Sequence, residues 1–395
     1  MIILGIETSC DETACAILEE KNGSFSVLAN IVSSQIALHS AWGGVVPNLA
    51  AREHLKNILP VINEALKKAK LSSSEIDLIT VTNGPGLIPA LLIGVETAKT
   101  LSYLWQKPLL GIHHIEGHIY ANFIDSSTTL SLIRRGAGGE VKSASSARLA
   151  KAMAKRADKF PVLCLVVSGG HTQLIFMKKR LHYEIIGETQ DDAVGEAFDK
   201  VARILGLGYP GGPAISATAE MAADKRGLNA EKRGLKKLSS EPAWQLPKLP
   251  RPMINSKDFN FSFSGLKTAV LYLVKKNEKL LSDKNFVSAV CQEFQQAVCD
   301  VLISKTIRAA KKYNPQTIML AGGVSANTQL RQQLGASVKD ELPHALYMIP
   351  DISYSVDNAV MIAVAGFFRY KSEKNKKGLR DNWKKLATSA NLKLK

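Results

Sequence analysis

The sequence contains few cysteines, and their spacing fits no covalent or metal-bound framework. There are five, an odd number without a C-x-x-C pair: Cys10, Cys15, Cys164, Cys291 and Cys299. Disulfide scaffolds of secreted proteins and zinc ribbons need paired or regularly spaced cysteines. We therefore expect reduced, mostly structural thiols and a cytoplasmic location.

Long apolar runs are also missing. No uninterrupted run approaches the ~20 residues that cross a bilayer, and the opening MIILGIETSCDET lacks the basic flank, long apolar core and cleavage site of a signal peptide. We expect no membrane association. Aromatic residues are scarce at 6%, but hydrophobic residues make up 46% of the 395 residues, enough for two domain cores.

Positive charge is abundant but concentrated in three segments. Residues 134–159, 224–257 and 369–395 together carry +20 of formal charge, whereas the whole chain carries +16, which leaves −4 for the remainder. Basic segments on a near-neutral body are typical of proteins that bind a polyanion. A solvated surface explains any one segment equally well, but the three together favour nucleic acid.

An internal repeat predicts two similar domains. Residues 2–6, 14–18 and 25–32 have the pattern of three successive strands, with a polar turn after the first. Residues 162–186 repeat this order about 160 residues later, with SGGHT as the turn. Such a repeat indicates two domains of similar topology that face each other across a cleft.

Helical and strand-like patterns alternate between and after the two copies, as in an α/β fold with crossover connections. They predict helices over 49–70, 87–105, 114–123 and 285–313, and strands over 78–82, 109–112 and 317–321. Two basic insertions interrupt the pattern. The first, over 126–158, is rich in Ser, Ala and Gly, with a short helix expected near 147–157; the second, over 224–250, contains several prolines.

Three glycine turns lie near the ends of predicted elements: SGGHT (168–172), YPGGP (209–213) and GGVSAN (322–327). Glycine lets the backbone approach a ligand closely, and the N–H groups of such turns can hold phosphate oxygens. One such turn usually serves only the geometry of the chain. Three in a doubled architecture favour a nucleotide cleft.

Two histidines one helical turn apart stand in GIHHIEGHIYAN (111–122). His114 and His118 share one helix face, where both imidazoles can bind one metal ion, whereas His113 points elsewhere. In the H-E-x-x-H pattern of metalloproteases the residue after the first histidine is the general base. Here it is Ile115, and Glu116 lies about 100° further round the helix. A helix start with satisfied core hydrogen bonds is the alternative to metal binding.

Ten motifs span roughly residues 1–370, apart from the two insertions. They are GIETSCDETA, GGVVPNLAAREH, GPGL, HHIEGH, VSGGHTQL, DDAVGEAFDK, YPGGP, FSFSGLKT, AGGVSAN and VDNAVMIA. In this order they resemble the universal family once known as O-sialoglycoprotein endopeptidases and now understood as the tRNA N6-adenosine threonylcarbamoyltransferases. The segments GETQDDAVGEAFDK and FSFSGLKT are similar in sequence to the bacterial members of this family.

The resemblance implies the actin/hexokinase/Hsp70-like (ASKHA) fold, an α/β fold of two similar domains with a nucleotide cleft between them. It also implies a reaction, in which threonylcarbamoyl-AMP gives its threonylcarbamoyl group to the N6 amine of adenosine 37 in tRNA and AMP leaves. A paralogous non-catalytic subunit and a small ATPase are the expected partners. The chain departs from the family in its longer insertions and Lys-rich tail, whose roles stay open.

Site residues follow from the resemblance, position by position. One divalent metal ion, commonly iron(II), with zinc or magnesium as alternatives, would be held by His114, His118 and Asp357. The adenylate would lie against Val166, Val167, Ser168, Gly169, Gly170, Asp199, Gly212 and Asn327. A bound cation suits acyl transfer, because negative charge develops on the carbonyl. Asp11 and Glu12 are candidates for proton removal or positioning, unless Asp11 only closes its turn.

Two other functions compete with the transferase. A zinc metalloprotease would need a base beside the first histidine, and a non-enzymatic, nucleotide-gated scaffold of the Hsp70-like class would not need the three metal ligands to converge. Asp357 could also merely cap the apolar helical run that follows it. The expected division is a first subdomain with the metal helix over 1–125, an insertion over 126–160, a second subdomain over 161–368, and a tail over 369–395.

Overall fold

The computed structural model describes residues 1–124, 159–220 and 246–394. The expected insertion over 126–158, with its short helix, and residues 224–245 of the second insertion lie outside these ranges. Within them, no helix is both long enough and apolar enough to cross a bilayer. All five cysteines are described and free, and four of them are buried.

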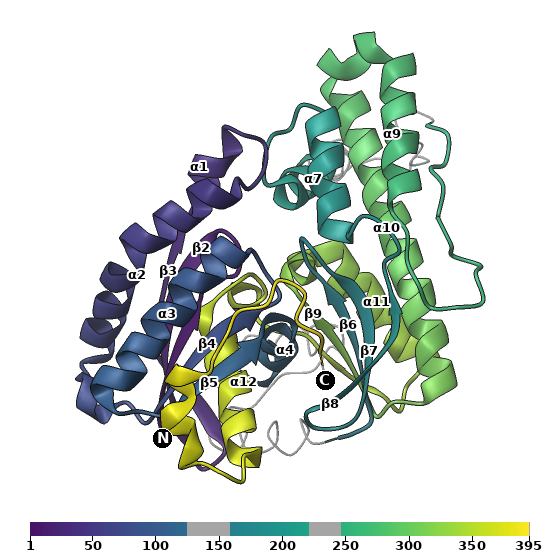
Figure 1. The fold of residues 1–395 in the computed structure, drawn as a ribbon. Coiled ribbons are helices and arrows are strands. Elements are labelled where there is room, and N and C mark those ends of the chain that lie inside the picture. The colour runs from purple at the N-terminus through teal and green to yellow at the C-terminus, as the bar shows by residue number, and fades with distance from the viewer. Residues whose placement is uncertain (125–158, 221–245, 395) are drawn as a thin grey trace, which may run out of the picture.

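The chain forms two five-stranded sheets of the same topology (Figure 1). The strands of the first are β1 (Ile2–Glu7), β2 (Glu12–Lys21), β3 (Ser24–Ser34), β4 (Leu78–Gly84) and β5 (Leu109–His113), in the order β3-β2-β1-β4-β5. The strands of the second are β6 (Val162–Val167), β7 (Thr172–Lys179), β8 (His182–Glu188), β9 (Thr317–Ala321) and β10 (Leu346–Met348), in the order β10-β9-β6-β7-β8.

The pairing senses also repeat. In each sheet the first three strands form an antiparallel meander, and the last two pair in parallel on the other side of the first strand. The register places Gly5 opposite Ala16 in one sheet and Val166 opposite Gln173 in the other. The predicted duplicated α/β fold with two similar halves is therefore confirmed.

Helices surround both sheets. Those that lie wholly within the described residues are α1 (Ile36–Ser40), α2 (Pro47–Ala69), α3 (Ile88–Trp105), α4 (His114–Tyr120), α7 (Val194–Ile204), α9 (Ser264–Lys276), α10 (Lys284–Tyr313), α11 (Thr328–Glu341) and α12 (Ala359–Ser372). Short 3-10 turns are η1 (Ser73–Glu75), η2 (Ala121–Phe123), η3 (Glu278–Ser282), η4 (Gly323–Ala326), η5 (Ile352–Tyr354) and η6 (Gly378–Lys384). The helices predicted over 49–70, 87–105 and 285–313 correspond to α2, α3 and α10.

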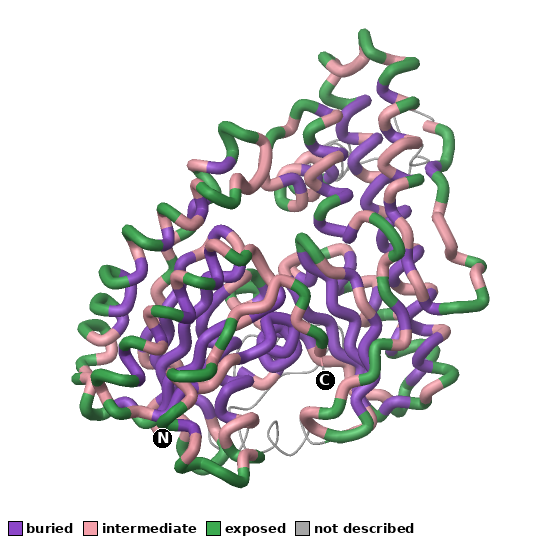
Figure 2. Tube along the Cα trace, viewed as in Figure 1, coloured by how far each residue is buried: buried purple, intermediate pink, exposed green. Residues whose placement is uncertain are grey.

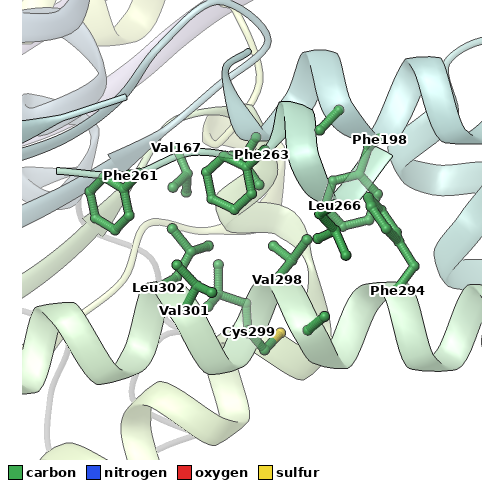
Figure 3. Close-up of a cluster of buried hydrophobic side chains, with 14 of the residues drawn as sticks. Val167, Phe198, Phe261, Phe263, Leu266, Phe294, Val298, Cys299, Val301 and Leu302 are labelled. Carbon is green, nitrogen blue, oxygen red and sulfur yellow. The ribbon is translucent and has the colours of Figure 1, made fainter. Parts of the chain in front are cut away.

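The first strand of each sheet is buried on both faces, which is why both read as continuous apolar runs, IILGIE and VLCLVV (Figure 2). In β6 the alternate residues Leu163, Leu165 and Val167 join the core beneath α7, α9 and α10, where Phe198, Phe263 and Phe294 also pack (Figure 3). The intervening residues Val162, Cys164 and Val166 face the opposite way, toward α4.

Helix α12 packs on the first sheet, although it lies in the range 161–368 expected for the second subdomain. Its residues 359–365 are all buried, against Ile3 of β1 and Ile112 of β5. Gly5 allows this approach, because a Cβ there would overlap the backbone carbonyl of Ala359. The chain thus returns to its first half after completing the second sheet, and Figure 1 shows α12 beside α4 and β5.

Helix α4 lies where the two halves meet. Its successive residues face different neighbours, as the 3.6-residue period requires. Ile115 and Ile119 pack against the second sheet beside Val166 and Met319, while Glu116 reaches Arg369 of α12. One face remains, and it carries His114 and His118.

Candidate active site

A cleft of about 600 Å³ lies between the two halves, within the size range of small-molecule sites. Its lining includes most of the candidate residues drawn from both halves, namely Asp11, Glu12, His114, Ser168, Gly169, Gly170, Asp199, Gly212, Asn327 and Asp357. The three glycine turns SGGHT, YPGGP and GGVSAN all contribute lining residues. His118 lies behind His114 and is fully buried.

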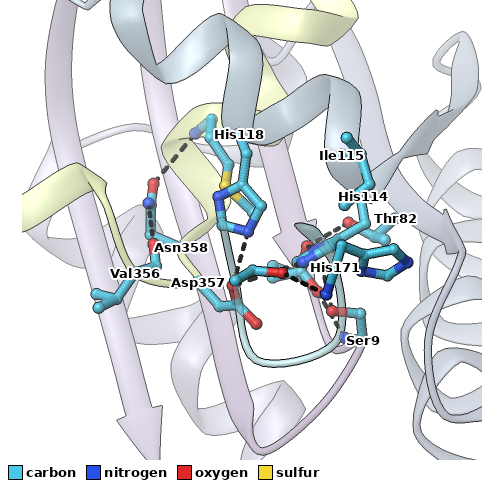
Figure 4. Close-up of polar contacts among 12 residues, drawn as sticks. Ser9, Thr82, His114, Ile115, His118, His171, Val356, Asp357 and Asn358 are labelled. Carbon is cyan, nitrogen blue, oxygen red and sulfur yellow. Dashed lines mark hydrogen bonds and ion pairs between the residues drawn. The ribbon is translucent and has the colours of Figure 1, made fainter. Parts of the chain in front are cut away.

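His114, His118 and Asp357 converge although 239 residues separate the last two. One ligand atom from each lies within 4.8 Å of the others. Asp357 Oδ1 is 3.6 Å from His114 Nε2 and 3.2 Å from His118 Nε2 (Figure 4). Helical spacing brings the two imidazole centroids to 4.6 Å.

The protein holds His114 in the orientation of a metal ligand. Its Nδ1 lies 3.1 Å from Ser9 Oγ and 3.3 Å from Glu7 Oε2, so that Nε2 faces Asp357. Glu7 is itself fixed, because its carboxylate accepts hydrogen bonds from Thr82 Oγ1 and from the Ser9 backbone N–H. A carboxylate that contacts the ring nitrogen opposite the metal-binding one, and so orients the ring, is typical of metal-bound histidine.

The surroundings also favour a cation electrostatically. Burial acts to lower the pKa of His114, but Asp357 and Glu7 outweigh it and raise that pKa to about 9. Burial likewise acts to raise the pKa of Asp357, but the imidazoles of His114 and His118 hold it below its ordinary value. Within the described residues, Nδ1 of the buried His118 has no hydrogen-bond partner, Nε2 faces Asp357, and burial lowers the pKa of this imidazole. Two imidazoles and one carboxylate therefore fit a divalent transition metal with open positions.

Asp357 is not the cap of α12, contrary to the alternative raised by the sequence. The N-cap is Asn358, whose side-chain oxygen accepts the Met361 N–H at 3.1 Å. The Asn358 amide nitrogen also donates to Val356 O at 2.7 Å, which anchors the turn around Asp357 (Figure 4). The carboxylate of Asp357 is thereby left to face the two histidines.

The other two polar residues of the HHIEGH motif point away from the cluster. His113 caps α4 by accepting the Ile115 N–H at Nδ1, and its Nε2 donates to Leu392 O at 2.9 Å. Glu116 is fully buried and makes a bidentate ion pair with Arg369, with N–O distances of 2.8–2.9 Å. A glutamate so engaged cannot act as the base of a metalloprotease.

Asp11 and Glu12 line the cleft at the start of β2. Burial, and then the nearby carboxylates of Asp357 and Asp11, raise the pKa of Glu12 well above its ordinary value. A carboxylate with a raised pKa is a stronger proton acceptor than a free one. Burial also raises the pKa of the neighbouring Cys10 thiol, so this cleft residue is not a thiolate nucleophile.

The candidate adenylate residues differ in how many of their polar atoms are already hydrogen-bonded within the protein. Asp199 Oδ1 accepts the Gly211 N–H at 2.7 Å, and within the described residues Oδ2 has no hydrogen-bond partner. Gly212 has open space where a Cβ would stand. Asn327 is already engaged, because its amide donates to Ser216 Oγ and Gln295 Oε1 and its oxygen caps α11 by accepting the Leu330 N–H.

Val166 and Val167 are absent from the lining of the cleft, so their expected contact with the adenylate stays a prediction. Both are fully buried, because β6 is covered on both faces. Sequence reasoning also did not select Tyr209, Ser216 and His171, which line the cleft. Tyr209 and His171 belong to glycine turns that were identified, so an extension to the turns' polar and aromatic residues would have found them.

The chain was compared with known proteins. The family model for tRNA N6-adenosine threonylcarbamoyltransferase matches residues 26–151 and 141–364. The chain belongs to the tRNA N6-adenosine threonylcarbamoyltransferase family. A relative of that name from Thermosipho melanesiensis is 46% identical over 368 residues, which cover 93% of this chain and 94% of the relative. The relative of that name from Persephonella marina is 43% identical over 374 residues, 94% and 91% of the two chains.

Among solved structures, a ROK family glucokinase from Streptomyces griseus aligns with 93% of this chain and 99% of its own, at 12% identity and a TM-score of 0.41. Family membership therefore rests on the sequence matches, and the cleft described above is the candidate active site of a member of the threonylcarbamoyltransferase family.

Proposed function

We infer that this chain transfers the threonylcarbamoyl group of threonylcarbamoyl-AMP to N6 of adenosine 37 in tRNA, forming t6A and releasing AMP. Membership of the family supports this function. The observation that carries it in the structure is the convergence of His114, His118 and Asp357 at one wall of a cleft whose other wall is made of glycine turns.

The reaction is an acyl transfer. The adenosine N6 attacks the carbamoyl carbon, a C–N bond forms, and the bond from that carbon to the phosphate oxygen of AMP breaks. A divalent cation held by His114, His118 and Asp357 would stabilise the negative charge that develops on the carbonyl oxygen. We propose iron(II) as this ion, because two imidazoles and a carboxylate are the ligand set of many non-haem iron sites, with zinc and magnesium as alternatives.

The N6 proton has to leave once the amine has attacked. We propose Glu12 as its acceptor, with Asp11 beside it in a positioning role. Burial and neighbouring carboxylates raise the pKa of Glu12, which favours acceptance of a proton near neutral pH. Both residues line the same cleft as His114 and Asp357.

The adenylate would lie along the second half of the cleft. The backbone of four lining residues would contact it, namely Ser168, Gly169, Gly170 and Gly212. At the three glycines no atom lies within 4 Å of the position that a Cβ would occupy. Asp199 Oδ2 is available to accept a ribose hydroxyl. We assign Asn327 an indirect role, in which it holds Ser216 and the start of α11 beside the ligand.

Transfer RNA is the macromolecular substrate, and basic segments are a suitable surface for it. Two of the three lie largely outside the described residues, whereas residues 369–394 are described, and η6 within them packs against α3 and β5 of the first half. We propose a paralogous non-catalytic subunit and a small ATPase as further partners, and the cytoplasm as the location. The free cysteines agree with that location.

The metalloprotease and scaffold alternatives are not favoured. The only glutamate of the HHIEGH motif is engaged with Arg369, and a nucleotide-gated scaffold gives no reason for the metal cluster. We also propose a first subdomain over 1–125 that is completed by α12, and a second subdomain over 161–358. The decisive test of function supplies purified chain with synthetic threonylcarbamoyl-AMP and unmodified tRNA. Appearance of t6A supports the transferase, and its absence with partners and metal supplied contradicts it.

A further inference from the structure

Arg331 is a buried cation just outside the cleft. It lies in the first turn of α11, directly after the glycine turn GGVSAN, and only 7% of it is exposed. Its guanidinium donates three hydrogen bonds, from Nε to Ser325 O, from Nη1 to Pro350 O at 2.9 Å and from Nη2 to Ser355 Oγ at 2.7 Å. The first acceptor belongs to the glycine turn and the other two to the loop that leads to Asp357.

None of these three acceptors carries a charge. Burial of a guanidinium whose hydrogen-bond acceptors are neutral is costly, although the nearby Asp351 carboxylate offsets part of this cost. The guanidinium fixes the relative positions of its three acceptors, because its N–H groups form a rigid planar fork. The bonds continue at both ends, since Ser325 N donates to Gly322 O at 2.8 Å and Ser355 Oγ donates to Asp351 O at 3.1 Å.

The two segments joined in this way serve different parts of the cleft. Gly323, Val324 and Ala326 of the turn line its nucleotide side. Ser355 stands two residues before Asp357, whose carboxylate faces His114 and His118. If a bound nucleotide displaces the Ser325 carbonyl, Arg331 therefore transmits the movement to the loop that carries Asp357.

We propose that Arg331 is a positioning residue that couples nucleotide binding to the geometry of the metal site. This inference rests on the proposed function, because it needs an adenylate on the turn and a cation at the cluster. Coupling between two sites is reciprocal, so AMP changes the affinity for the metal by the same factor as the metal changes the affinity for AMP.

The test is a titration of the metal-free full-length chain with cobalt(II), followed by its visible spectrum, with and without saturating AMP. In the wild type we expect AMP to shift the cobalt Kd by a factor on the order of 5 to 100 and to alter the spectrum. Arg331→Gln and Arg331→Lys should bind both probes but reduce this factor to below about 2, because neither side chain restores the three-way fork.

The matched control is Arg308→Gln. Arg308 also donates to backbone carbonyls, those of Ile254 and Asp258, but outside the cleft lining, so its loss should leave the coupling factor unchanged. Ser355→Ala removes both the Nη2 acceptor and the Ser355 hydrogen bond to Asp351 O. If the Arg331 variants do not fold, this variant tests the inference, and we expect a lower coupling factor in a chain that still binds each probe.

Two results would overturn the inference while leaving the proposed function intact. One is a coupling factor in Ser355→Ala and the Arg331 variants equal to that of the wild type. The other is a wild type that binds both probes independently. A wild type that binds neither cobalt(II) nor AMP would contradict the proposed function itself, and the coupling with it.

Discussion

Replacing Glu116 by glutamine should destabilise the protein without removing its chemistry. The Glu116 carboxylate is fully buried and makes three contacts of 2.8–2.9 Å with Arg369, which joins the metal helix α4 to α12. Breaking a fully buried ion pair by removal of one charge costs about 3–5 kcal/mol. The Arg369 side chain is 35% exposed, so water can solvate it in part, and we expect a loss of about 2–3 kcal/mol.

For a chain of 395 residues a loss of that size corresponds to a fall in Tm of about 3 °C. Differential scanning calorimetry of the metal-loaded protein would measure it, alongside t6A formation per bound metal at a temperature well below the transition. Asp381→Asn is the control, because it breaks an exposed pair with Lys384 and should not change Tm measurably. A Glu116→Gln variant with the wild-type Tm but no transfer would refute the reasoning, because it would place Glu116 in the chemistry.

Three further predictions concern the nucleotide side and the basic surface. Gly212→Val should weaken AMP binding at least tenfold in calorimetric titration at an unchanged Tm, because the added side chain enters open cleft space; equal affinity would remove Gly212 from the ligand site. Asn327→Ala should lower Tm by removing a helix cap worth about 1 kcal/mol and two further hydrogen bonds, so an unchanged Tm would contradict its structural role. Deletion of residues 134–159, which carry a net charge of +6, should weaken tRNA binding and flatten the dependence of log affinity on log salt, by about 0.9 per lost phosphate contact in duplex regions; an unchanged slope would exclude this segment from the tRNA surface.

The sequence was most informative where a period repeats. The two first strands β1 and β6 and the duplicated meander follow from apolar runs that recur about 160 residues apart. The four-residue spacing of His114 and His118 also placed both on one face of α4, since helix geometry fixes that relation locally.

Long-range packing could not be read in the same way. Nothing in the pattern of α12 says that its apolar faces cover the first sheet rather than the second. Asp357 and Asn358 are adjacent and both residue types can cap a helix, and a sequence pattern does not locate the start of a helix to within one residue. The hydrogen bonds of Asn327 to Ser216 and Gln295 join three separate segments, so its indirect role was visible only in the folded chain.

The central claim is that Asp357 completes one metal site with His114 and His118, and metal analysis of Asp357→Asn tests it most directly. Asparagine keeps the size of the side chain, and the cap on α12 belongs to Asn358, so the fold should persist. Asn358→Ala is the matched control, because it removes the cap, at about 1 kcal/mol, together with the hydrogen bond to Val356 O, and keeps the carboxylate. The account predicts that Asp357→Asn loses bound metal and t6A formation together while Asn358→Ala retains both. Full metal occupancy and normal transfer in Asp357→Asn would contradict the shared site.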